Sequence, residues 1–134
     1  KEASGSVADF KKYVEANPNA RVYSGDDGML CDYVPHKCVG LVSVASNIWP
    51  KETNLYTKKA LDQKLNSDEI AMWKRAADTM FIVSNPVPVK NIMWAKGKIK
   101  NKTMRAPLSD RDLTDNTVIL KACDEVSSWF KNNV

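Results

Sequence analysis

The sequence predicts an α/β fold whose parallel strands lie in the first half and whose second half is helical. β-type runs alternate with helical patterns in the order expected for two consecutive βαβ units. From Pro50 onward, the apolar residues of the remaining segments recur every three or four positions, as in helices. Crossovers this compact fit either a (β/α) barrel or a doubly wound sheet.

The first six residues, Lys1 to Ser6, have the composition of a strand end followed by a turn. We therefore expect this chain to begin in the middle of a fold, with a strand that ends at Lys1. Ser6 and Asp9 then form a capping-box-like start. They predict a helix over Val7 to Ala16, ended by Asn17 and Pro18.

Two further strands are predicted, each at a point where β-type residues precede a turn or a helix. Ala20 to Tyr23 is a short strand that ends in the Gly- and Asp-rich loop 24–28. A short helix is expected over Met29 to Val34. The run from Val39 to Val44 is almost entirely apolar and β-branched, which is typical of a parallel strand covered on both faces.

The second half is predicted to be helical throughout. Pro50 suits the first turn of a helix that extends to Asn66, and Ser67-Asp68-Glu69 starts the next one. The segment 84–90 breaks that helix, a further helix runs to about Lys96, and the last begins near Thr114 and Asp115. We divide the chain into residues 1–65, which contain the strands, and residues 66–134, a C-terminal helical domain.

Composition excludes several classes of protein. With 43% hydrophobic and 27% charged residues, the chain is globular rather than disordered. The net charge is +4, but no ladder of aromatic residues accompanies the basic residues, so we expect no nucleic-acid binding. No apolar run is long enough to span a membrane, so we expect no membrane binding. Three cysteines cannot all pair, which suits a cytoplasmic protein. His36 and Cys38 are too few for a metal site, and we expect no metal and no cofactor.

Candidate chemistry lies at the carboxyl ends of the predicted strands, where parallel sheets bind their ligands. These ends are Lys1, the loop 24–27 and the segment 44–47. Together they supply an amine, a glycine and carboxylates, a set that suits carbonyl chemistry, because a desolvated lysine can attack a ketone. Taken alone, an N-terminal lysine is usually solvated, and Asp26 and Asp27 are more often loop or capping acids.

Five segments in register resemble the 4-hydroxy-tetrahydrodipicolinate synthase (dihydrodipicolinate synthase) family of pyruvate-dependent Schiff-base lyases. The segments are Lys-Glu-Ala-Ser-Gly-Ser at 1–6, Ser-Gly-Asp-Asp at 24–27, Gly-Leu-Val-Ser-Val-Ala-Ser-Asn at 40–47, Asn-Pro-Val-Pro-Val-Lys at 85–90 and Arg-Ala-Pro-Leu at 105–108. The resemblance covers nearly the whole chain but only the C-terminal half of the family's enzymes. It implies the C-terminal half of a (β/α)8 TIM barrel followed by a C-terminal helical domain.

The resemblance also implies a reaction and its residues. Lys1 matches the lysine that forms a Schiff base with pyruvate for an aldol-type condensation with aspartate semialdehyde, in lysine and diaminopimelate biosynthesis. Gly25 matches a glycine on the aldehyde side of the pocket, and Val42 matches an aliphatic residue that packs on the pyruvate adduct. The segment 85–90 resembles one that shapes the wall beneath the site, and no chemistry is assigned to it.

The family's other functional groups fall outside this sequence. Its carboxylate-binding threonines, proton-relay tyrosines and substrate-binding arginine belong to the N-terminal half, so we expect this chain alone to be inactive and to need that missing half as a partner. The family also implies a homo-oligomer. Two alternatives remain: an N-acetylneuraminate or keto-deoxy-sugar-acid lyase of the same family, or a noncatalytic half-barrel interaction module.

Overall fold

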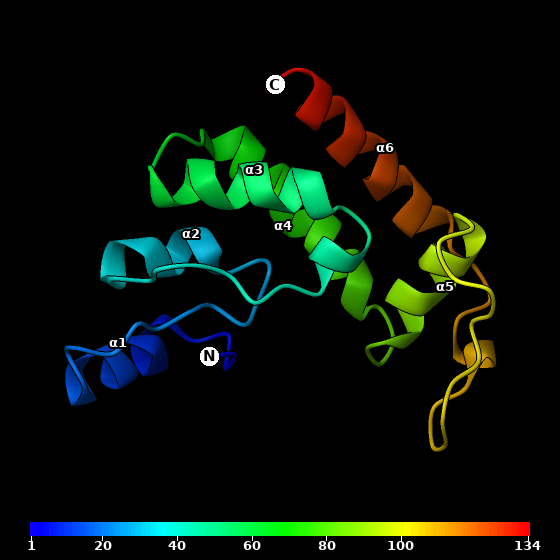
Figure 1. Ribbon diagram of the computed structural model, residues 1–134, viewed down its shortest axis with the longest axis horizontal. Coiled ribbons are helices and arrows are strands. Elements are labelled where there is room, and N and C mark those ends of the chain that lie inside the picture. Colours follow the sequence, from blue (N-terminus) through cyan, green and yellow to red (C-terminus); the bar gives the residue numbers. More distant parts are fainter.

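A computed structural model describes residues 1–134. Figure 1 shows α1 and α2 on the side of the N-terminus, α3 and α4 in the middle and α5 on the opposite side, with α6 running from beside α5 back toward α3 and α4. The helical elements are α1 (Val7–Ala16), α2 (Leu30–Tyr33), η1 (Val34–His36), η2 (Ala45–Asn47), α3 (Pro50–Leu61), α4 (Ser67–Asp78), η3 (Thr79–Phe81), α5 (Val87–Ala95), η4 (Asp110–Asp112) and α6 (Thr117–Lys131).

The predicted strands are wrong as regular strands, although the predicted direction of pairing is confirmed. The structure contains only two isolated parallel bridges, which join Glu2 to Ser24 and Ser24 to Leu41. The outer segments have bonding partners on one side only: Ala3 N–H and Leu41 N–H, which point away from the central segment, make no hydrogen bond. A regular parallel strand needs consecutive bonded pairs, whereas each pair of neighbouring segments here forms a single bridge.

Helix boundaries follow local capping chemistry. α1 has the predicted bounds, because the Ser6 hydroxyl accepts a hydrogen bond from Asp9 N–H over 3.2 Å. α4 begins at Ser67 as predicted, and its capping box pairs Asn66 with Glu69.

Three other predicted boundaries are wrong. α3 ends at Leu61 instead of Asn66, where the chain turns through a left-handed residue, Gln63. α5 begins at Val87, inside the predicted break, because Pro88 is tolerated in a first helical turn. α6 begins at Thr117 because the Asp115 carboxylate accepts hydrogen bonds from the N–H and the hydroxyl of that residue.

The core of the helical part is built around Trp73 of α4, which is fully buried. Its ring stacks on Tyr56 of α3 at 4.2 Å between centroids, and the edges of Trp49 and Trp129 approach it at 6.1 Å. The Trp73 indole N–H also donates to the backbone oxygen of Asp27 over 3.2 Å. This contact ties the helical core to the loop that follows the central bridged segment.

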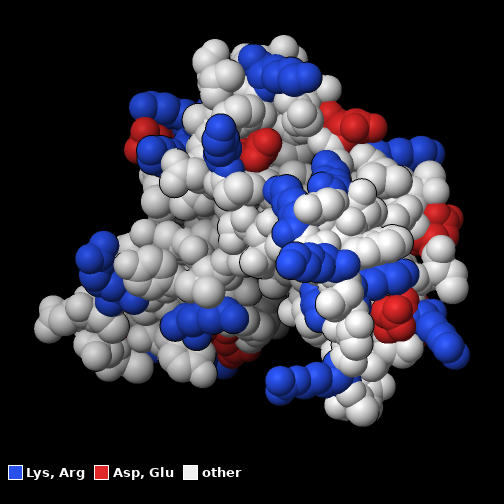
Figure 2. Space-filling model, turned by 45° about the vertical axis from the view of Figure 1, so that its right-hand side comes forward, with Lys and Arg blue, Asp and Glu red and all other residues white.

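Charge is distributed over the surface without a pattern that identifies a partner. Figure 2 shows many Lys and Arg side chains on the face of α5 and the loop after it, where Lys98 donates to the Ile48 backbone oxygen and Lys102 lies over the Trp94 ring. No helix in residues 1–134 has the length and apolar character needed to cross a lipid bilayer.

Candidate functional site

Three chain segments place Lys1, Gly25 and Val42 on one face of the molecule. The central segment donates from Ser24 N–H to Gly40 and from Gly25 N–H to Glu2 over 2.9 and 2.6 Å, and Val42 N–H donates back to Ser24 over 2.8 Å. Side chains of extended segments alternate between two faces. Glu2 and Ser24 are buried on one face, whereas Lys1 and Val42 are exposed on the other.

The aliphatic stem of Lys1 lies directly against Gly25. A Cβ atom added to Gly25 would be 2.8 Å from Lys1 Cγ and 2.8 Å from the Ala3 methyl group, and it would overlap Lys1 Cε. Only a residue without a side chain leaves room for this lysine. Two of the candidate residues are therefore in contact, although the Lys1 side chain is exposed to solvent.

A tyrosine that the sequence analysis did not select lies on the same face. The Tyr23 ring covers Gly40, where an added Cβ would be 2.8 Å from Tyr23 Cε1. Tyr23 and Gly40 thus repeat the arrangement of Lys1 and Gly25 one segment further along. The alternation of side chains could have identified Tyr23 from the sequence. Residues two apart in an extended segment share a face, so Tyr23 lies on the same face as Gly25.

Asp27 is a structural carboxylate, as the capping interpretation of the loop acids predicted. It is 1% exposed, and it accepts hydrogen bonds from Val44 N–H at 2.8 Å, from Ala45 N–H at 3.2 Å and from the Ser43 hydroxyl. Burial raises the pKa of Asp27, and these donors partly oppose that rise. The side chain therefore binds the start of η2 to the central segment and is not free for a substrate.

The other polar residues at the predicted strand ends also satisfy local backbone groups. Asp26 accepts from Gly28 N–H over 2.9 Å, and the amide of Asn47 donates to the Val44 backbone oxygen over 2.9 Å. No group of three or more His, Cys, Asp or Glu side chains is arranged to hold a metal ion. The side-chain ammonium of Lys1, on the same face, makes no ion pair.

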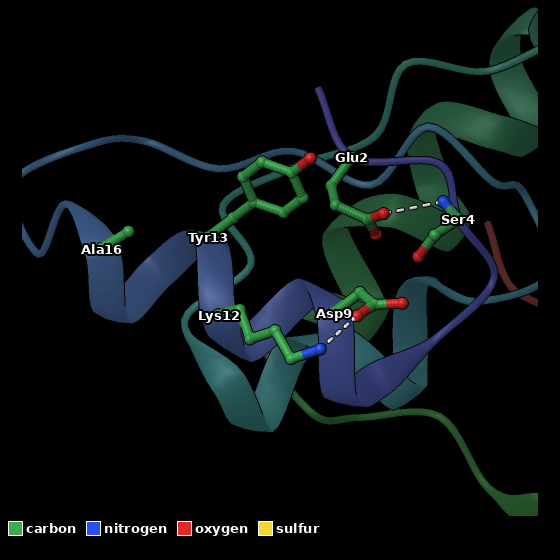
Figure 3. A pocket seen from close by; sticks show the side chains of 6 residues that line it. All are labelled: Glu2, Ser4, Asp9, Lys12, Tyr13 and Ala16. Carbon is green, nitrogen blue, oxygen red and sulfur yellow. Dashed lines mark hydrogen bonds and ion pairs between the residues drawn. The ribbon is translucent and has the colours of Figure 1, made fainter.

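One surface cavity lies on the side of the N-terminal segment that carries Glu2, opposite Lys1. It has a volume of about 390 Å³ and is lined by Glu2 and Ser4 together with Asp9, Lys12, Tyr13 and Ala16 of α1 (Figure 3). Lys12 pairs with Asp9 over 2.8 Å at its mouth. No candidate site residue lines this cavity, so it is separate from the face that presents the lysine amine.

Comparison with known proteins identifies relatives over almost the whole chain. Residues 1–124 match the model of the Dihydrodipicolinate synthetase family. A 4-hydroxy-tetrahydrodipicolinate synthase from Francisella philomiragia subsp. philomiragia is 39% identical over 132 residues, which are 98% of this chain and 45% of the relative. This chain therefore spans less than half the length of that curated relative.

Solved structures agree with this relationship. The 4-hydroxy-tetrahydrodipicolinate synthase of Methylacidiphilum fumariolicum SolV superposes with a TM-score of 0.74 at 30% identity, over 95% of this chain and 42% of its own. A chloride-inhibited dihydrodipicolinate synthase from Acinetobacter baumannii, solved in complex with pyruvate, has a TM-score of 0.76 at 26% identity, over 95% and 44%. The arrangement of segments and helices in this chain is thus that of one part of these enzymes.

Proposed function

Because this chain belongs to the dihydrodipicolinate synthetase family, we propose that it forms part of a 4-hydroxy-tetrahydrodipicolinate synthase, a lyase, in which Lys1 forms the Schiff base. The observation that supports this role is the contact of the Lys1 stem with Gly25 on an open face. The amine has no ion-pair partner there. A lysine that is not engaged by a carboxylate can reach a carbonyl group once its surroundings are desolvated.

The proposed reaction begins with attack of neutral Lys1 Nζ on the keto carbon of pyruvate. The keto oxygen leaves as water, and an iminium ion forms. The iminium accepts the C–H electron pair when a proton leaves the methyl carbon, and the resulting enamine attacks the aldehyde carbon of aspartate semialdehyde. The relative from Acinetobacter baumannii, which was solved with pyruvate, supports pyruvate as the first substrate.

Two further residues are proposed to line this site. Val42 is 46% exposed on the lysine face, so its isopropyl group is available to pack on a pyruvate adduct. Gly25 accommodates the Lys1 stem and lines the aldehyde side of the pocket. We assign no catalytic role to Asp27, because its buried carboxylate already has three donors.

The remainder of the active site is proposed to come from chain that this sequence does not contain. The curated relative from Francisella is more than twice as long as the matched region. The unpaired N–H groups of Ala3 and Leu41 lie on opposite outer edges of the bridged segments. We propose that further strands of a (β/α)8 barrel pair with these edges, and that residues 66–134 form the helical domain attached to it.

The whole protein is proposed to be a cytoplasmic homo-oligomer. Three free cysteines support a reducing compartment. Phe81 and Ile82 are 48% and 47% exposed in the helical part and supply apolar surface for contact between copies. Sedimentation velocity of the native protein tests the oligomer, and a monomer at micromolar concentration would contradict it.

Borohydride trapping tests the role of Lys1. The native protein is incubated with pyruvate and sodium borohydride, and the modified residue is identified by peptide mass spectrometry. We expect one added group per chain, equal to pyruvic acid less one oxygen atom, on Lys1 Nζ. Lys1→Arg is the matched control, because it retains the charge and the backbone nitrogen of residue 1. Equal labelling of Lys1→Arg, or no labelling of the native protein, would refute the proposal.

A further inference from the structure

Glu2 is buried directly beside the exposed Lys1. Its side chain is on the opposite face of the segment, and it is the only buried residue among the first five. Its backbone N–H donates to Tyr23 over 2.9 Å, and its carbonyl oxygen accepts from Gly25 N–H over 2.6 Å. Glu2 therefore sets the position of the backbone from which Lys1 projects.

Only one oxygen of the Glu2 carboxylate has a partner. Oε1 accepts from Ser4 N–H over 2.7 Å, as Figure 3 shows, while Oε2 is buried without a hydrogen bond. The hydroxyl of Tyr33 in α2 is also buried without a partner. A native structure rarely leaves such groups unsatisfied, because each has lost its hydrogen bonds to water.

The unpartnered hydroxyl and the unpartnered oxygen are neighbours. Burial, followed by the charge of Glu2, raises the pKa of Tyr33 to about 12. The hydroxyl thus keeps its proton at every pH near neutrality and is available as a donor. The Tyr33 ring is fully buried and stacks on Phe10 at 4.3 Å with an interplanar angle of 17°, so the direction of its hydroxyl is set by packing.

We propose that the Tyr33 hydroxyl donates a hydrogen bond to Glu2 Oε2, and that this bond makes Glu2 and Tyr33 positioning residues for Lys1. A single bond of this kind satisfies both groups. This inference rests on the Schiff-base function proposed for Lys1. It adds two residues on the buried face, which touch neither substrate nor the reacting atoms.

The location of the pair explains why it affects the lysine. The segment containing Lys1 is held to the central segment by two backbone hydrogen bonds, both made by Glu2. The Glu2 side chain is its second anchor, because it reaches into the layer formed by α1 and α2. If this anchor loosens, the segment can tilt, and Lys1 Nζ moves relative to Gly25.

A double-mutant cycle on adduct formation tests the proposal. The parent protein, Tyr33→Phe, Glu2→Gln and the double variant are compared by the rate of borohydride trapping of pyruvate on Lys1. We expect each single variant to be slower by about 10-fold at saturating pyruvate, since a displacement of about 1 Å can cost about 100-fold. The pyruvate concentration for half-maximal rate should stay within about two-fold. The double variant should be no slower than either single one, because both remove the same bond.

Tyr56→Phe is the matched control. This variant also removes a tyrosine hydroxyl, one that forms a hydrogen bond with the Cys31 thiol over 3.2 Å. Tyr56 belongs to α3 and not to the segments around Lys1. Its trapping rate should equal that of the parent. The proposal would be overturned if Tyr33→Phe had the parent trapping rate. It would also be overturned if the double variant were slower than the parent by about 100-fold, the product of two independent 10-fold effects.

Urea unfolding of the same four proteins separates this inference from the proposed function. If the parent takes up no pyruvate on Lys1, the proposed Schiff-base function is wrong. The equilibrium constants for unfolding of the four proteins still test the hydrogen bond between Tyr33 and Glu2. The bond is supported if the change in the unfolding constant of the double variant is smaller than the product of the changes in the two single variants. A double variant whose change equals that product would refute the bond. Tyr33→Phe retains the stacked ring, so this arm remains informative if Glu2→Gln does not fold.

Discussion

Replacing Gly25 with alanine is expected to displace Lys1. The added methyl group would be 2.8 Å from Lys1 Cγ and from the Ala3 methyl group, whereas carbon atoms prefer separations of about 3.5–4.0 Å. The Lys1 stem can swing aside, but Ala3 Cβ is attached to the backbone. The segment 1–3 must therefore move by about 1 Å, which also stretches the 2.6 Å bond from Gly25 N–H to Glu2.

The expected magnitude follows from this movement. A shift of about 1 Å in a reacting group can lower a rate by about 100-fold, and overpacking of this kind costs about 1–3 kcal/mol of stability. The assay is the rate of borohydride trapping of pyruvate on Lys1, with urea unfolding measured in parallel.

Two variants serve as controls. Gly28→Ala adds a methyl group whose nearest neighbours are at 3.5 Å, so it should retain the parent rate within about three-fold. Ala3→Gly in the Gly25→Ala background relieves one of the close contacts and should recover stability more than rate. A Gly25→Ala protein that is labelled as fast as Gly28→Ala would refute the reasoning.

Three other predictions concern the supports of the site and the helical core. Asp27→Ala should lower the free energy of unfolding in urea by about 3 kcal/mol, because three donors lose a buried acceptor, whereas the exposed Asp32→Ala should change it little. Burial raises the pKa of Glu69, but donors that include the Trp129 indole outweigh it, and the pKa lies below its ordinary 4.5. The charged Glu69 therefore contributes its full stabilisation above pH 4.5, and this contribution is lost as the pH falls through the lower folded-state pKa. Glu69→Gln should lower the free energy of unfolding in urea by about 1 kcal/mol at neutral pH, and this difference should vanish in acid. Burial raises the pKa of Cys31, so its alkylation by iodoacetamide at pH 8 should be several-fold slower than in the urea-unfolded chain, and equal rates would contradict this.

The sequence was sufficient for features that depend on neighbouring residues. The bounds of α1 and the start of α4 follow from caps within three residues of the helix start. The family was recognisable from short segments in register, and the match over residues 1–124 confirms it. The role of Asp26 as a loop acid is local as well, since it accepts from Gly28 N–H, whereas the partners of Asp27 lie in the segment 43–45.

The tertiary structure was needed wherever a contact joins distant segments. The β-type runs at 20–23 and 39–44 have strand composition, yet the bridges beside them are isolated ones at Ser24 and Leu41, because a strand needs repeated pairing with a distant segment and composition does not set that pairing. The Tyr23 ring over Gly40 and the Lys1 stem over Gly25 likewise depend on pairing between segments more than fifteen residues apart.

Lys1 itself illustrates the division. The motif Lys-Glu-Ala-Ser-Gly-Ser was enough to propose the lysine as the Schiff-base residue, because the chemistry of an amine is a property of one residue. Its position against Gly25 and beside the buried Glu2 was decided only when the three segments came together, because backbone pairing determines which side chains share a face. Residue identity therefore supplied the candidate amine, and the non-local hydrogen bonds determined its surroundings.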